Sequence, residues 1–303
     1  MFEEGKLHER VERALAILEN CCLCPRRCQV NRLKGELGKC NTGRQAVVSS
    51  SGSHFGEEAP LVGSGGSGTI FFTHCNLKCC FCQNYATSQL GEGQEVEARE
   101  LASMMLSLER RGCNNINFVS PTHVVSQILE ALEIAVEAGL SVPLVYNSGG
   151  YDAVDTLKLL DGVFDIYMPD MKYSDGQNAQ RFSGIDDYPQ INRAAVKEMH
   201  RQVGDLRWDD QGAATRGLLV RHLVLPKGLA GTAEACRFLS QEISVDTYLN
   251  VMAQYRPCFK AFDIPELAYS ISREEFMEAI ETARSYGLYR LDRIEPRSFA
   301  GVL

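Results

Sequence analysis

The sequence lacks three features that would place the protein in a membrane, outside the cell or on nucleic acid. No uncharged apolar run reaches the ~18 residues that a membrane helix needs. Residues 1–4 are partly acidic and contain no apolar core of the kind found in signal peptides. A basic excess is also missing, because 31 Lys and Arg face 39 Asp and Glu for a net charge of −8. We therefore expect a cytoplasmic protein that binds neither a membrane nor nucleic acid.

The cysteines are abundant and unevenly placed. Twelve occur in 303 residues, and nine of them fall between positions 21 and 82. In a reducing compartment, clustered cysteines are metal ligands more often than disulfide partners. The other three, Cys113, Cys236 and Cys258, stand alone and are expected to be small buried hydrophobic residues.

Three cysteines on one short loop have the spacing C-x3-C-x2-C: Cys75, Cys79 and Cys82. Three thiolates can bind three irons of a cubane cluster and leave the fourth iron open to a cofactor or substrate. A structural zinc site is the alternative, but zinc is typically bound by two well-separated pairs of ligands, and this loop fits that pattern poorly. Cys80 is out of register and is expected to pack against its neighbours.

An earlier group, Cys21, Cys24, Cys28 and Cys40, has the spacing C-x2-C-x3-C-x11-C in a glycine-containing segment. Four thiolates could bind zinc or a second Fe–S cluster. The alternative is reduced cysteines on a loop. Few large apolar residues surround them, so a metal would help this segment to fold, and we predict a second metal site here.

The apolar pattern predicts strands that alternate with helices from residue 69 onward. Six strands of this kind indicate parallel βαβ units and a partial (β/α)6 barrel, open on one side, because a closed barrel needs eight. A helix over residues 7–18 and the first cysteine group form an N-terminal segment, residues 1–62, before a core of residues 63–303. The predicted strands cover residues 69–73, 115–119, 143–146, 165–168, 218–224 and 248–252.

Polar side chains follow several of these strands. Asn147, Asp170, Lys172 and Arg221 come at or near the carboxyl ends of strands, where barrels of this kind carry their sites. A structural ion pair at the barrel rim is the alternative for the charged residues. His123 follows the second strand and could donate a proton, but we expect a surface histidine there.

The loop with Cys75, Cys79, Cys82 and the aromatic Phe81 resembles the signature of the radical S-adenosylmethionine (SAM) superfamily. Over roughly residues 20–290 the chain resembles the pyruvate formate-lyase activating enzyme branch, and most closely its uncharacterised members with an N-terminal cysteine segment. The resemblance implies the partial barrel and a [4Fe–4S] cluster that reductively cleaves SAM. The resulting 5′-deoxyadenosyl radical abstracts hydrogen from a substrate.

The resemblance also implies roles for five residues. Asp170 and Lys172 match an Asp-x-Lys after the fourth strand, and Arg221 matches a fifth-strand arginine; all three would bind SAM. Asn147 would face the ribose, and Phe81 would stack near the adenine.

One motif of that branch is missing. A Gly-Gly-Glu stretch usually follows the second strand and receives the amino group of the cofactor. Here the same place contains Ser120 and Thr122, which could supply oxygen acceptors, but no carboxylate.

Two functions follow from the resemblance. The first is an activase that takes hydrogen from a backbone glycine of a glycyl-radical protein. The second is a radical enzyme acting on a small molecule or another macromolecule. Either would need an electron donor such as flavodoxin or ferredoxin. A non-catalytic Fe–S carrier or zinc protein is a third alternative, which would not require Asp170, Lys172 and Arg221 at strand ends. No catalytic residue is assigned.

Overall fold

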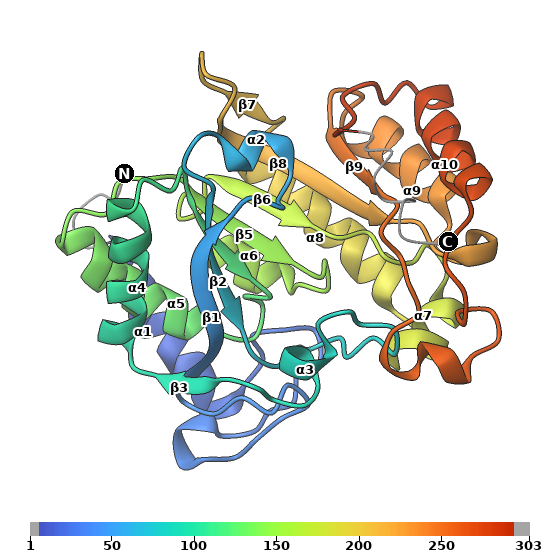
Figure 1. Ribbon diagram of the computed structural model, residues 1–303. Helices are drawn as coiled ribbons and strands as arrows, with labels where there is room; N and C mark the ends of the chain where they lie inside the picture. The colour runs from blue at the N-terminus through green and yellow to red at the C-terminus, as the bar shows by residue number, and fades with distance from the viewer. Residues whose placement is uncertain (1–5, 294–303) are drawn as a thin grey trace.

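Six parallel strands alternate with helices in the computed structural model, which describes residues 6–293 (Figure 1). Their order across the sheet is β2-β4-β5-β6-β8-β9. In the described part of the chain β2 pairs with an antiparallel strand and not with β9, so the barrel is open. The predicted partial (β/α)6 barrel is therefore confirmed. The parallel strands are β2 (Ser67–Phe72), β4 (Ile116–Val119), β5 (Leu144–Ser148), β6 (Ile166–Pro169), β8 (Ala214–Leu223) and β9 (Tyr248–Met252).

Two of the helices between and after these strands, α4 and α10, begin with a capping box. In α10 the Ser272 side chain caps the helix, and Glu275 completes the capping box. Figure 1 shows α4 and α5 on one side of the molecule and α9 and α10 on the other. The helices are α3 (Tyr85–Ser88), α4 (Ala98–Arg110), α5 (Val125–Glu137), α6 (Val154–Leu159), α7 (Gly176–Ser183), α8 (Tyr188–Val203), α9 (Thr232–Phe238) and α10 (Arg273–Ser285).

The N-terminal segment is joined to the sheet. Helix α1 (Lys6–Ala16) packs on α5, where the Ser126 hydroxyl donates to the Ala14 carbonyl at 2.6 Å. Sequence reasoning missed β1 (Ala46–His54), which pairs antiparallel with β2, and the short β3 (Gln94–Val96) beside it. It also missed α2 (Ala59–Val62) and the edge strand β7 (Arg207–Trp208). The expected boundary at residue 62 thus falls between two paired strands.

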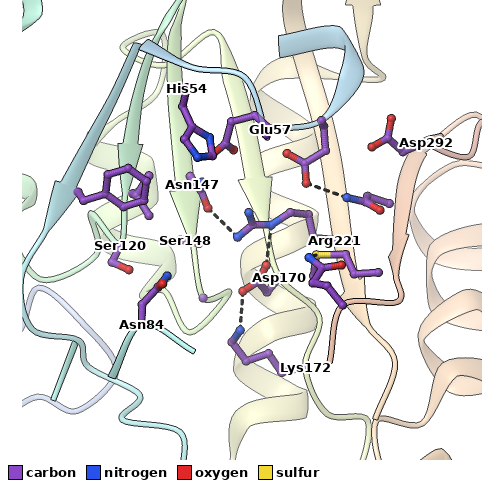
Figure 2. A pocket seen from close by; sticks show the side chains of 18 of the residues that line it. His54, Glu57, Asn84, Ser120, Asn147, Ser148, Asp170, Lys172, Arg221 and Asp292 are labelled. Carbon is purple, nitrogen blue, oxygen red and sulfur yellow. Dashed lines mark hydrogen bonds and ion pairs between the residues drawn. The ribbon is translucent and has the colours of Figure 1, made fainter. Parts of the chain in front are cut away.

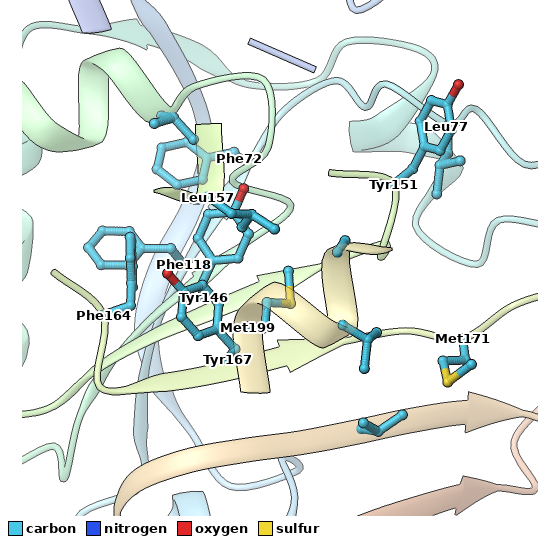
Figure 3. Close-up of a cluster of buried hydrophobic side chains, with 14 of the residues drawn as sticks. Phe72, Leu77, Phe118, Tyr146, Tyr151, Leu157, Phe164, Tyr167, Met171 and Met199 are labelled. Atoms are coloured by element: carbon cyan, nitrogen blue, oxygen red, sulfur yellow. The ribbon is translucent and has the colours of Figure 1, made fainter. Parts of the chain in front are cut away.

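An aromatic cluster fills the space between the sheet and the outer helices. Phe118, Tyr146, Phe164 and Tyr167 contact one another with ring centroids 5.0–6.0 Å apart (Figure 3). Each is almost fully buried, so this packing holds the strands that carry the site.

The solitary Cys113, Cys236 and Cys258 are buried, as predicted.

Within residues 6–293, no helix combines the length and apolar character that crossing a bilayer requires. The prediction that the sequence has no apolar core of a signal peptide rests on residues 1–4, which lie outside the described residues.

Candidate functional site

A cavity of about 1290 Å³ lies at the carboxyl ends of the parallel strands. Residues after β4, on β5, after β6 and on β8 line it, so polar groups far apart in sequence converge as predicted. The volume exceeds the ~300–1,000 Å³ of an ordinary small-molecule pocket. The cavity therefore has room for a cofactor and a second reactant.

The cysteine loop after β2 forms one wall of this cavity. Cys75, Cys79 and Cys82 all line it, whereas Cys80 does not. The sulfur of each lining cysteine accepts a hydrogen bond: from the Leu77 amide (3.4 Å), the Ser183 hydroxyl (3.1 Å) and the Ser88 hydroxyl (3.2 Å), respectively. Hydrogen bonds to cysteine sulfur are among the features that tune Fe–S clusters, so these three residues fit a cluster.

Burial of the Cys75 thiol bears on metal binding. Burial raises the pKa of the Cys75 thiol to about 11, so its thiolate needs a nearby positive charge that a metal supplies. Among residues 6–293, no three Cys, His, Asp or Glu side chains are grouped to hold one metal ion. In a cubane each thiolate binds a different iron, so the three sulfurs need not surround one ion.

Asp170 lies between two cations, Lys172 and Arg221 (Figure 2). Its carboxylate accepts a hydrogen bond from Arg221 Nε at 2.8 Å and from Lys172 Nζ at 2.5 Å. Arg221 also donates to the Asn147 side-chain oxygen at 2.7 Å. The structure thus brings together the four polar residues predicted from the sequence.

The charges in this cluster keep one another ionised. Burial opposes ionisation of Asp170, but Arg221 and Lys172 outweigh it and lower the pKa of the carboxyl. Burial likewise opposes protonation of Lys172 and Arg221, but Asp170 outweighs it and raises the pKa of both. The cluster carries one negative and two positive charges, which leaves a net positive charge facing the cavity.

Two residues of α8 hold the loop that carries Asp170. The Tyr188 hydroxyl, which has one proton to donate, lies 2.9 and 3.0 Å from the carbonyl oxygens of Gly149 and Asp170. The Asn192 amide donates to the carbonyls of Gly150 and Asp170 at 3.0 and 2.9 Å. The ends of β5 and β6 are therefore fixed relative to each other.

The segment after β4, where the Gly-Gly-Glu stretch is missing, contributes hydroxyl groups. Ser120 and Thr122 both line the cavity. The Thr122 hydroxyl donates to buried Asp152 at 2.7 Å, together with the hydroxyls of Tyr146 and Ser148. Of these two hydroxyl groups, that of Thr122 is therefore bonded to Asp152, whereas that of Ser120 is not.

His123 is buried, so the prediction of a surface histidine is wrong. Its Nε2 lies 2.9 Å from the Thr73 carbonyl, and burial lowers the pKa of the imidazole to about 3. A neutral imidazole cannot serve as a proton donor of the imidazolium type. The sequence could not predict this burial, because whether a histidine just before a helix is buried depends on residues far away in the chain.

Phe81 does not line the cavity, so its expected place against the adenine is corrected. Its ring is 4% exposed and makes edge contacts with Tyr173, Phe182 and Tyr255, whose centroids lie 5.8–6.4 Å away. These contacts exist because the apolar ring turns away from the cysteine sulfurs into the core. Phe81 therefore anchors the loop by packing.

Sequence reasoning missed the acidic residues that enter the cavity beside α2. Glu57 accepts from the Asn117 amide at 3.2 Å, and Glu58 accepts from the Asn250 amide at 2.9 Å. Burial raises the pKa of Glu58, and its second oxygen has no partner. Their only sequence signal is a Glu-Glu pair before Ala59 and Pro60, which is typical of a helix start.

The N-terminal cysteines occupy a different place. Cys21, Cys24, Cys28 and Cys40 line a small separate cavity, while Cys22 is exposed. Their metal stays a prediction.

Comparisons with known proteins place the chain in a family. No protein-family model matches it. An uncharacterised protein of Methanocaldococcus jannaschii, MJ0674, is 33% identical over 289 residues, which cover 92% of this chain and 78% of the relative. The chain belongs to the MJ0674 family.

The fold of this MJ0674-family chain also occurs in solved structures. The crystal structure of HydG, a maturase of the [FeFe]-hydrogenase, aligns over 98% of this chain with a TM-score of 0.53 and 13% identity. The chain spans 59% of the length of HydG, and at this identity the likeness shows the fold alone. A native anSMEcpe structure with bound AdoMet aligns over 71% of this chain and 58% of its own, with 12% identity and a TM-score of 0.48, too low to support an inference.

Proposed function

We propose that this protein is a radical SAM enzyme. The observation that carries the proposal is that Cys75, Cys79 and Cys82 line the same cavity as the Asp170 ion cluster. A loop of three thiols with one missing ligand suits a cluster whose fourth iron binds a cofactor. When bound, the cluster supplies the electron for reductive cleavage of SAM.

Arg221 and Lys172 are suited to bind the carboxylate of SAM. Arg221 uses Nε for Asp170 and one terminal nitrogen for Asn147, which leaves further N–H groups free to donate. Lys172 uses one Nζ donor for Asp170. Asp170 accepts from both cations and so positions them. Asn147 retains its amide N–H₂ as a donor to a ribose hydroxyl.

A protein glycine is our proposed source of the hydrogen, on the basis of the resemblance to the activating enzymes. The open side of the barrel and the cavity volume of about 1290 Å³ support entry of a peptide loop. A flavodoxin or ferredoxin would supply the electron. A small molecule is the alternative, and the free oxygen of buried Glu58 supports one with an N–H donor.

Product analysis tests the proposed chemistry. Anaerobically reconstituted protein with dithionite and SAM should yield 5′-deoxyadenosine and methionine. The full-length Cys75→Ala, Cys79→Ala, Cys82→Ala variant should lose about four irons per chain and form neither product. Unchanged iron content in that variant would contradict the cluster assignment.

The substrate needs a separate test. Incubation with candidate glycyl-radical proteins, followed by electron paramagnetic resonance, should give a doublet that depends on the partner's glycine. Cleavage of SAM without any such signal would favour the small-molecule alternative.

A further inference from the structure

Four cysteines from the N-terminal segment surround one cavity of about 10 Å³, separate from the active-site cavity. Cys21, Cys24 and Cys40 are buried and Cys28 is half-buried. The Lys39 amide donates to Cys28 Sγ at 3.4 Å, and a side chain on Gly38 would lie 2.9 Å from that sulfur. The backbone thus approaches the sulfur closely, and hydrogen bonds to ligand sulfurs are among the features that tune Fe–S clusters.

A buried cation also lines this cavity. Arg32 is 1% exposed, donates from Nε to the Gly43 carbonyl and from Nη1 to the His123 carbonyl, and has its Nη2 without a partner. Its Nη1 lies 3.9 Å from Cys21 Sγ. Among its partners within residues 6–293 there is no carboxylate. An unpaired charge in the core is costly, so this guanidinium needs an anion at the cavity.

The four thiols and the buried cation together suit a protein-bound iron–sulfur cluster. Four thiolates can hold its four irons, and the centre that they form is an anion beside Arg32.

We propose that Cys21, Cys24, Cys28 and Cys40 ligate a second iron–sulfur cluster and that Arg32 is its buried counter-charge. All four positions of the cluster are then bound by protein, so this site is closed to substrate. His123 lines both this cavity and the large one, so a single side chain lies in the wall between the two sites.

The test uses the full-length Cys75→Ala, Cys79→Ala, Cys82→Ala variant, which lacks the ligands of the first cluster. After anaerobic reconstitution with ferrous iron and sulfide, this variant should retain equal amounts of iron and acid-labile sulfide. Adding Cys28→Ser should remove both, whereas adding Cys22→Ala, at the exposed neighbouring cysteine, should leave them unchanged. One zinc without sulfide, or no metal, would overturn the proposal.

The role of Arg32 is tested by the reduction potential of the cluster. Arg32→Gln should lower the reduction potential of the retained cluster, because a positive charge beside it is removed, and Arg32→Lys should largely restore it. Equal potentials in all three proteins would remove Arg32 from the proposal. If the triple variant does not fold, wild-type protein should bind about eight irons and its Cys28→Ser variant about four. Failure of SAM cleavage would leave these outcomes unaffected.

Discussion

The guanidinium of Arg221 donates a hydrogen bond of 2.8 Å to the carboxylate of Asp170, although 51 residues separate them in the chain. The contact joins β8 to the residue that follows β6, and both groups are buried or nearly so. A backbone bridge between the same two residues extends the pairing of the two strands. The same two residues therefore connect the strands through both a backbone bridge and an ion pair in the cavity wall.

Removing Asp170 should destabilise the fold. Asp170→Ala leaves two buried cations without their partner, which typically costs about 3–5 kcal/mol. Urea unfolding of the apoprotein at pH 7 measures the loss. Glu242→Ala, which removes an exposed ion pair with Lys197, is the matched control and should change little. Equal effects of the two substitutions would contradict the strength assigned to the buried cluster.

Removing Arg221 should weaken binding of SAM. If its free N–H groups bind the cofactor carboxylate, Arg221→Ala loses a charge-assisted contact of about 1.5–3 kcal/mol. Calorimetric titration of the reconstituted protein with SAM measures the change. Arg216→Ala serves as the control, since Arg216 lies on the same strand outside the cavity lining. Wild-type affinity in Arg221→Ala would return the residue to a structural ion pair.

Arg26 should control the order of the cysteine loop. It donates to the carbonyls of Asn76 and Leu77 inside that loop, at 2.9 and 3.5 Å, and to Ser183 and Gly184. Arg26→Ala should cost about 2–3 kcal/mol and speed the loss of iron to a chelator.

The adjacent arginine provides the control for Arg26. Arg27 is exposed and, among the described residues, forms an ion pair with Asp155 at 3.8 Å, so Arg27→Ala should release iron at the wild-type rate. If both variants release iron equally fast, the loop is not held by Arg26.

Glu58 should make stability depend on pH. Burial raises the pKa of its carboxyl above the ordinary 4.5, so the folded state binds the proton more tightly than the unfolded state. Its contribution to stability is therefore fully present below pH ~4.5 and is lost as pH rises through the folded pKa. Glu58→Gln should become more stable relative to wild type between pH 5 and pH 8. Urea unfolding at several pH values checks this, and a constant difference would refute it.

Gly150 should not tolerate a side chain. Its φ is +73°, and a Cβ would lie 2.0 Å from the Asp170 carbonyl oxygen and 2.3 Å from the Asn192 amide. Gly150→Ala should therefore cost roughly 3 kcal/mol or more. Gly139→Ala isolates the backbone cost, because Gly139 has φ +98° but open space around it, and should cost about 1–2 kcal/mol. Thermal unfolding of both variants measures the difference.

The parallel core of the fold could be predicted because its signal is local. Each strand is a short apolar run followed by a polar residue, and the wall with Asn147, Asp170 and Arg221 follows from the rule that strand ends converge. The strand β1 was missed because its sequence, with four serines and a glycine among nine residues, is weakly apolar.

The other wall of the cavity could not be predicted, for a different reason. Glu58 and Asn250 meet across 192 residues, and nothing near either residue indicates the pairing. Phe81 and His123 show the same limit, because whether a ring faces a cavity or the core depends on packing neighbours elsewhere in the chain. Motif spacing located the cysteines, but only tertiary contacts placed the residues around them.

The contact between Glu58 and Asn250 also bears on how the molecule assembles. Bringing these residues together closes a loop of 192 positions, so it carries a large entropy cost early in folding and becomes favourable only after the intervening strands have formed. During synthesis, β1 to β8 leave the ribosome before β9. The nascent sheet can therefore pair before Asn250 of β9 is available to Glu58. We therefore expect hydrogen exchange to show β9 protected last during refolding, after β4 to β6.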